Sequence, residues 1–231
     1  MSLSGYIART QELLENPVST PPLYATSDLT NYVNIARSQL AGESGCIRAI
    51  LSLATVANVN SYPFSAMTGL PTGVLIPANC RMITVPVNGG RAFLDFRPWE
   101  WFNRYRLATT GIANAQPTIW TQYGQGISGT LYFSATPDAV YNLSIDTACL
   151  PIELVDNTTV EAIPYPWSDA VPFFAAYYAY MSAQRQQDAE QMFKRYEEFT
   201  ARARMMSTPD INPLQFNQRG PSAPPQQGGA G

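Results

Sequence analysis

Apolar residues recur every three or four positions from Ser168 to about Met206, in the longest helical pattern of the chain. Gln, Asp, Glu, Lys and Arg lie on the other side of the helix, and within this run no glycine or proline follows Pro172. This spacing predicts one helix of about 55 Å, with Ser168 or Asp169 as its N-cap and Pro172 in its first turn. The stripe comprises Phe174, Tyr178, Met181, Arg185, Ala189, Met192, Tyr196, Phe199, Ala203 and Met206.

A rod of this length exceeds what a compact domain of this size needs, so it favours packing against other helices. Those helices belong either to the same chain or to neighbouring subunits, and a core helix of a monomer is the alternative. An apolar stripe of this kind marks the buried side of a helix. The residues expected at the helix-packing or oligomer interface are Phe174, Tyr178, Met181, Met192, Tyr196 and Phe199.

Two shorter helical patterns begin the chain. The first starts after Ser2 or Ser4 and ends at Asn16-Pro17, since the residue before a proline disfavours helix. The second opens at Ser27 or Asp28, and we expect Gly42 to close it. Their apolar faces carry Leu3, Ile7 and Leu14 in the first helix and Leu29, Tyr32, Val33, Ala36 and Leu40 in the second.

Between residues 45 and 150 the apolar period changes to two, which indicates half-buried strands. Residues 47–53 alternate in this way, and residues 81–87 and 91–96 flank Asn88-Gly89-Gly90, a strong hairpin signal. Residues 71–77 are expected to form a loop. Further strands are predicted over 118–123, 130–134 and 139–146. Roughly six strands predict an antiparallel sandwich or small barrel.

The order of the elements therefore predicts an α+β protein in which a β domain is inserted into a helical bundle. Residues 1–44 and 151–206 would form the bundle, with two short N-terminal helices packing on the long C-terminal one. Residues 45–150 would form the inserted antiparallel β domain, and residues 207–231 an extended C-terminal arm.

The arm is rich in proline and glycine and cannot bury a core of its own. Ordering it costs about 1–2 kcal/mol of backbone entropy per residue, so an outside surface must supply the stabilisation. Its large apolar side chains, Ile211, Leu214 and Phe216, are the expected anchors.

Charge and composition narrow the function classes. Charged residues make up 13% of the chain, about half of the usual ~25%. Surfaces with so few charges are often covered by partner chains, and a surface of Ser, Thr, Asn and Gln is the alternative. A net charge of −3 argues against general affinity for nucleic acid or anionic membranes. No signal peptide is expected at the N-terminus, and no apolar run approaches the 18 residues of a membrane span.

The sequence offers little for catalysis or metal binding. Without histidine, the usual general base and most zinc sites are missing. Cys46, Cys80 and Cys149 are scattered, with neither disulfide nor zinc spacing, and are expected to be buried thiols. A carboxylate pair for glycoside hydrolysis remains the alternative. Its candidates, which no spacing links, are Asp95, Glu100, Asp138 and Asp146. We expect no catalytic residue, metal or cofactor.

Two further motifs have a structural and a functional interpretation. Residues 124–129 match GxGxxG, but a strand pattern follows them rather than the helix that a dinucleotide site needs, so we expect a hairpin loop. Residues 97–106 interleave arginine with aromatics, which suits either a ligand-stacking patch or a short helix. The second alternative, which we favour, packs Trp99, Phe102 and Tyr105 under the β domain and leaves Arg104 and Arg106 outside.

Five stretches, in this order, resemble the head-to-tail adaptor proteins of tailed bacteriophages. The resemblance extends over nearly the whole chain up to residue 206, and its motifs are structural rather than chemical. They are residues 36–48 (ARSQLAGESGCIR), 96–99 (FRPW), 117–126 (PTIWTQYGQG), Pro137-Asp138 with Tyr141, and 163–171 (IPYPWSDAV) leading into AAYYA.

The resemblance implies a structural virion protein that assembles in the host cytoplasm and forms a homo-oligomeric ring, usually of twelve copies, at the virion neck. DNA would pass through its lumen without sequence-specific binding. The C-terminal arm would bind the portal protein through Ile211, Leu214 and Phe216, and the β domain would contact a downstream tail or nozzle protein. The alternative function is a carbohydrate-binding module or carboxylate-dependent glycosidase of a phage tail.

Overall fold

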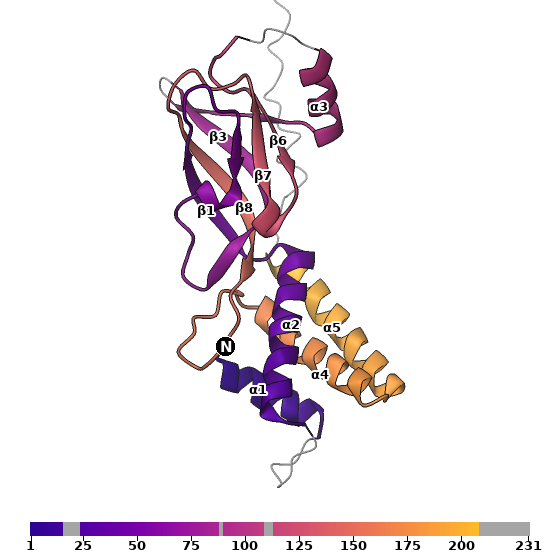
Figure 1. The fold of residues 1–231 in the computed structure, drawn as a ribbon. Helices are drawn as coiled ribbons and strands as arrows, with labels where there is room; N and C mark the ends of the chain where they lie inside the picture. Colours follow the sequence, from indigo (N-terminus) through magenta and orange to yellow (C-terminus); the bar gives the residue numbers. More distant parts are fainter. Residues whose placement is uncertain (16–23, 88–89, 109–112, 208–231) are drawn as a thin grey trace, which may run out of the picture.

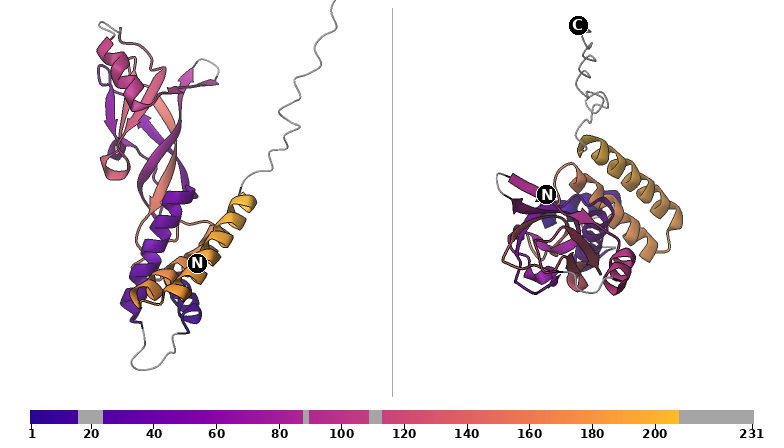
Figure 2. Two further views of the ribbon diagram at one scale, coloured as in Figure 1. Left: turned by 90° about the vertical axis from the view of Figure 1, so that its right-hand side faces the viewer. Right: turned by 90° about the horizontal axis from the view of Figure 1, so that it is seen from above.

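The computed structural model describes residues 1–15, 24–87, 90–108 and 113–207. Within these residues the fold is mixed α+β, with five α-helices and two four-stranded sheets, neither of which closes into a barrel. The molecule is elongated: α1, α2, α4 and α5 gather at one end, and the sheets with α3 form the other (Figures 1 and 2). No described helix is long and apolar enough to cross a membrane.

The two N-terminal helices form where the apolar spacing places them. Helix α1 (Leu3–Leu13) is capped by Ser2, whose hydroxyl accepts a hydrogen bond from the Gly5 amide, as expected. Helix α2 (Thr26–Ser44) runs past Gly42 and ends at Gly45, which adopts a left-handed φ of +59° and donates its amide to the Ala41 carbonyl. The predicted end at Gly42 is therefore wrong, because Gly45 supplies the conformation that closes the helix.

The prediction of one long C-terminal helix is also wrong. A 3₁₀ turn (Trp167–Ala170) leads into α4 (Val171–Ser182), and α5 (Gln186–Ser207) then folds back beside α4 (Figure 2). Pro172 does lie in the first turn of α4, but no side chain caps that helix, so neither Ser168 nor Asp169 acts as expected.

The break needs neither glycine nor proline. Gln184 takes a left-handed φ of +58°, and the Arg185 amide bonds the Tyr180 carbonyl at 2.9 Å to close α4. Arg185 then pairs with Asp188 in the first turn of α5. Residues 182–188 contain no large apolar side chain, so no hydrophobic contact favours continuing the helix through them.

The first sheet has the strand order β1-β8-β3-β4, and the second has the order β2-β7-β6-β5. The first comprises β1 (Arg48–Ala54), β3 (Val74–Val87), β4 (Gly90–Phe93) and β8 (Asn142–Pro151). The second comprises β2 (Ser61–Pro63), β5 (Asp95–Phe96), β6 (Ile119–Tyr123) and β7 (Thr130–Ser134).

Side chains from both sheets share one apolar core. Leu51, Ile145 and Ile83 lie side by side across β1, β8 and β3, and none of the three is exposed. The second sheet contributes Trp120 and Phe133, which are paired across β6 and β7 and are both buried. The period-two alternation of the sequence thus places the buried side chains correctly.

Several strand predictions need correction. Strand β3 begins at Val74, inside the segment expected to be a loop, because its first residues pair with the end of β8. Strand β8 extends to Pro151, and the predicted strand 91–96 divides into β4 and β5. Strand β5 runs parallel to β6, so the sheets are not purely antiparallel. The hairpin prediction is confirmed by the antiparallel register of β3 and β4.

Candidate interaction surfaces

The interface residues expected from the stripe lie on α4 and α5, where aromatic rings join the two helices. Phe174 and Tyr196 are buried, and their ring centroids are 4.6 Å apart. Phe199 is half-buried and stacks on Phe173 at 4.7 Å. Much of the stripe therefore packs within one molecule, since the turn at residues 183–185 brings its two halves together.

The other three stripe residues lie nearer the surface. Tyr178 is half-buried and stacks on Tyr32 of α2, with a centroid distance of 6.4 Å and nearly parallel rings. Met192 is half-buried against the core, whereas Met181, at the end of α4, is 43% exposed. These positions leave apolar area of the helical end in contact with solvent.

A buried ion pair, which sequence reasoning missed, fastens α2 to the segment after β8. Arg37 is 1% exposed and binds both carboxylate oxygens of Glu161 at 2.9 Å. It also donates to the Ile152 carbonyl at 2.8 Å and to the Asn34 side chain at 3.1 Å. Each of the three guanidinium nitrogens thus donates to an acceptor, as burial of a charge requires.

Tyr6 of α1 is fully buried beside this pair. Burial, reinforced by the negative charge of Glu161, raises the pKa of Tyr6 well above its ordinary value. The ion pair and the neutral phenol of Tyr6 therefore lie where α1 and α2 meet the segment after β8 (residues 152–166, called the return segment). Their contacts hold these three parts of the chain together.

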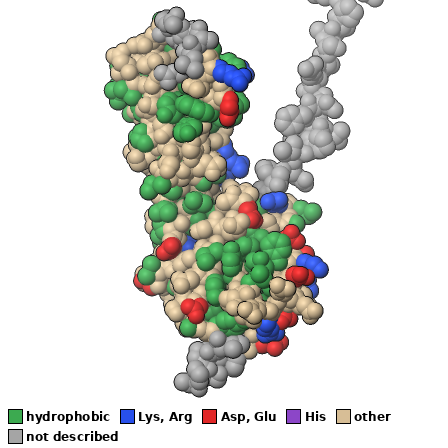
Figure 3. Space-filling view, turned by 45° about the vertical axis from the view of Figure 1, so that its right-hand side comes forward, with side chains coloured by type: hydrophobic (Ala, Val, Ile, Leu, Met, Phe, Trp, Pro, Cys, Tyr) green, Lys and Arg blue, Asp and Glu red, His purple; other side chains and the backbone are tan. Residues whose placement is uncertain are grey.

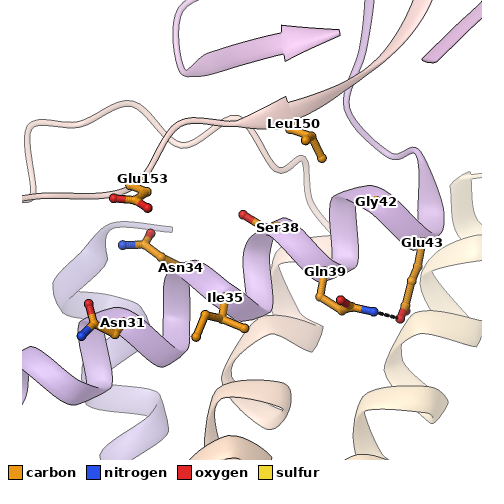
Figure 4. A pocket seen from close by; sticks show the side chains of 9 residues that line it. All are labelled: Asn31, Asn34, Ile35, Ser38, Gln39, Gly42, Glu43, Leu150 and Glu153. Carbon is orange, nitrogen blue, oxygen red and sulfur yellow. Dashed lines mark hydrogen bonds between the residues drawn. The ribbon is translucent and has the colours of Figure 1, made fainter. Parts of the chain in front are cut away.

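An open groove runs along the outer face of α2 and the end of β8 (Figure 4). Its wall carries small polar side chains with Ile35 among them, and Glu153 faces it from the return segment. The side-chain amide of Asn34 is bound to the backbone of Leu154. It accepts a hydrogen bond of 2.9 Å from the Leu154 amide and donates one of 3.1 Å to the Leu154 carbonyl. The groove offers exposed amides and carboxylates but no convergent reactive set.

The outer face of the first sheet exposes apolar side chains. Ile50 and Met82 flank Asp146 across three strands, and they are 74% and 43% exposed. Phe93 of β4 lies on the same face through its pairing with Thr84, and it is 69% exposed. Asp146 pairs with Arg48, so the charge within this surface is compensated.

The helical end exposes apolar side chains as well, and they gather on the face of α2, α4 and α5 in Figure 3. The large apolar side chains exposed on α2, α4 and α5 are Ile35, Met181, Phe193, Met205 and Met206. Exposed apolar groups that cluster in this way are typical of protein interaction surfaces. The molecule thus carries one such surface at each end.

The arginine and aromatic motif forms α3 (Trp99–Ala108), which covers the second sheet. Trp99 packs on Tyr123 and Tyr132 at 4.8 and 4.9 Å, and Phe102 is fully buried. The favoured structural interpretation of these two residues is confirmed. Trp101 is 41% exposed, but the Arg97 guanidinium lies 5.2 Å from its ring and Tyr105 stacks on it at 5.1 Å.

The glycine motif forms the loop between β6 and β7, as expected, with left-handed φ at Gly124 and Gly126. Gly129 must lack a side chain, since a Cβ there would lie 2.4 Å from the Phe64 ring. The loop is followed by a strand, so it lacks the helix N-terminus that receives a dinucleotide.

Two of the four candidate carboxylates, Asp138 and Asp146, have partners in the structure. Asp146 pairs with Arg48, and Asp138 accepts a hydrogen bond of 2.6 Å from the Tyr141 hydroxyl. The described part of the chain contains no group of three His, Cys, Asp or Glu residues that could hold a metal ion. Burial raises the pKa of all three cysteine thiols.

The predicted portal anchors Ile211, Leu214 and Phe216 lie outside the described residues. Comparison of the sequence with protein-family models gave no match, and comparison with curated proteins gave none either.

Proposed function

We propose that the protein is a structural head-to-tail adaptor of a tailed-bacteriophage virion, a ring-forming subunit between the portal and the tail. The observation that carries this proposal is the pair of exposed apolar surfaces at opposite ends of an elongated molecule (Figures 1 and 3). A protein that bridges two partners needs two separate surfaces, and low overall charge suits surfaces that other chains cover.

The proposed architecture is a helical bundle that carries an inserted β-sandwich domain and an extended arm. Residues 1–44 and 151–206 form the bundle and residues 45–150 the insertion. Contacts of α4 with α1, α2 and α5 support the bundle, and the shared core of the two sheets supports the sandwich.

In this assembly the arm, residues 207–231, binds the portal through Ile211, Leu214 and Phe216. Burial of each side chain is worth about 1.5–3 kcal/mol, and these three are expected to carry most of the docking energy. The outer face of the first sheet, with Ile50, Met82 and Phe93, contacts the next tail component.

The ring itself is a homo-oligomer, of twelve copies if it matches a twelvefold portal. The net charge of −3 suits a lumen through which DNA passes without being held. Met181 and Phe193, exposed on the helical end, are available for contacts between neighbouring subunits.

One experiment tests the portal contact and the ring together. The full chain, a chain ending at Ser207, and the Leu214→Ser/Phe216→Ser double variant are mixed with purified portal protein and imaged by electron microscopy. Rings on the portal are expected only with the full chain, and circular dichroism should show all three proteins equally folded. Equal binding by the truncated chain would refute the role of the arm, and absence of any ring would refute the adaptor function.

A further inference from the structure

A groove runs along α5 and consists of two adjoining hollows. The first lies between α4 and the N-terminal half of α5, with Tyr177, Met181 and Phe193 in its wall. The second continues past Phe193 and Tyr196 to Arg204, beside the end of α2. Phe193 and Glu197 border both hollows, so the two form one continuous channel, termed here the α5 groove.

The floor of the first hollow is apolar and exposed to solvent. Phe193 is 36% exposed although its ring lies 5.3 Å from that of Tyr177 and 6.0 Å from that of Tyr196. Met181 is 43% exposed at the far end. Figure 3 shows apolar area exposed on the helical end. The rim carries both signs of charge, with Glu190, Lys194 and Glu197.

The position at which the described chain ends indicates what fills the groove. The second hollow begins at Arg204, one helical turn before Ser207, the last residue of α5. From Arg204 back to Gln186 the groove is about 27 Å long at the rise of an α-helix. An extended chain of eight or nine residues covers about the same distance. Ile211, Leu214 and Phe216 follow Ser207 within nine residues.

We propose that residues 208–216 fold back and bind in the α5 groove of the same chain, with Leu214 and Phe216 against Phe193 and Tyr177. Pro209 and Pro213 favour extended backbone at the residues before them, which lowers the entropy cost of this path. Because the segment is tethered to α5, its effective concentration is in the millimolar range, so an affinity of about 1 mM for the separate peptide is enough to fill half of the grooves.

The groove is thus a storage site for the arm in the free protein. The proposal does not depend on the proposed function and concerns the protein without any partner. Where the proposed function also holds, portal and groove compete for the same three side chains. The apparent Kd of portal binding then equals the intrinsic Kd divided by the fraction of molecules in which the arm is free.

Methionine methyl groups provide probes at the right positions. With ¹³C-methyl methionine, the resonance of Met181 reports on the groove and that of Met82 on the distant sheet face. The full chain and a chain ending at Ser207 are compared in the absence of portal protein. The Met181 resonance is expected to differ between them while Met82 stays unchanged. A synthetic peptide of residues 208–219, added to the truncated chain, should move Met181 back towards its position in the full chain.

Point variants test the anchors without removing the arm. Leu214→Ser with Phe216→Ser in the full chain should give the Met181 resonance of the truncated chain. Phe193→Gln in the truncated chain should weaken peptide binding at least tenfold. The matched control, Phe93→Gln on the sheet face, should leave it unchanged.

Three results would overturn the proposal. The first is a Met181 resonance that is the same in the full and truncated chains. The second is a difference between these chains that survives in the Leu214→Ser/Phe216→Ser variant. The third is a difference that grows with protein concentration, together with a dimer in sedimentation, because the arm of a second copy would then occupy the groove.

Discussion

Helices α4 and α5 are neighbours in the chain and in space, yet they are built on different principles. Helix α4 has 12 residues and no charged side chain, and eight of its residues are buried. Helix α5 has 22 residues and eight charged side chains, and its buried positions form a narrow stripe. That stripe is Ala189, Tyr196, Thr200 and Ala203.

This difference shows that one apolar period in the sequence can run through two separate helices, of which one is buried on most sides and the other on one side only. A helix that is apolar on all sides must be covered on all sides, and α4 contacts α1, α2 and α5. Its alanines, Ala175, Ala176 and Ala179, are fully buried and let those helices approach closely. Helix α5 needs only one buried side and serves as the outer layer of the helical end.

The largest expected effect comes from placing the same charge on each helix. Ala175→Asp buries an unpaired carboxylate in α4 and should lower the free energy of unfolding by about 4 kcal/mol or more. Ala201→Asp, on the exposed side of α5, should change it by no more than about 0.5 kcal/mol. Urea unfolding followed by circular dichroism measures both. Similar losses for the two variants would show that α4 is not the centre of the helical end.

A buried and an exposed ion pair should differ in the same way in their contribution to stability. Arg37→Met leaves Glu161 buried and unpaired and should cost about 3–5 kcal/mol, whereas Arg37→Met with Glu161→Leu should recover part of the loss. Arg195→Ala breaks the exposed pair with Glu198 on α5 and should cost at most about 1 kcal/mol. Thermal unfolding of the unaltered protein and the three variants gives the order of their stabilities. A double variant no more stable than Arg37→Met would contradict the account given for the buried pair.

A smaller effect concerns Tyr196, which donates a hydrogen bond of 2.8 Å to Glu43 and so ties α5 to α2. Burial and then the nearby Glu43 raise the pKa of this phenol. The unfolded chain releases the proton near pH 10 while the folded chain keeps it. Stability should therefore fall above pH 10, by up to about 1.4 kcal/mol per pH unit for this group.

The corresponding measurement compares urea unfolding at pH 9 and pH 11. Tyr196→Phe should make the loss of stability between these pH values smaller. The control, Tyr123→Phe at a 55% exposed position, should leave it as in the unaltered protein. An unchanged loss in Tyr196→Phe would mean that this phenol does not govern the alkaline limit.

Local patterns in the sequence predict much of this fold, because they report which side of an element is buried. The alternation that buries Leu51, the Asn88-Gly89 hairpin and the face of α2 all follow from near neighbours. The break after α4 was missed because Gln184, rather than a glycine, takes the left-handed conformation. The order of the strands in each sheet could not be predicted from local patterns, because pairings such as Arg48 with Ala148 join distant parts of the chain.

The interaction surfaces were predictable to a lesser degree. Arg37 carried a signal, because it lies on the apolar face of α2 four residues after Val33, where a charge must find a partner. Its partner Glu161 is 124 residues away, and no periodicity connects the two. The α5 groove could not be foreseen from a single helix, because it exists only where α5 lies beside α4 and the end of α2.

The two crossings between the helical end and the sheets lie next to each other. The chain leaves α2 through Gly45 into β1 and returns from β8, and β1 and β8 are paired neighbours, with the Cys149 amide bonded to the Ile47 carbonyl at 2.9 Å. The two junctions are therefore separated by about one strand spacing, roughly 5 Å. Recombination at these two points would exchange the sheet-bearing half as a cassette without altering the path of the helices. A lineage built on this plan could change what one end recognises and keep the other end intact.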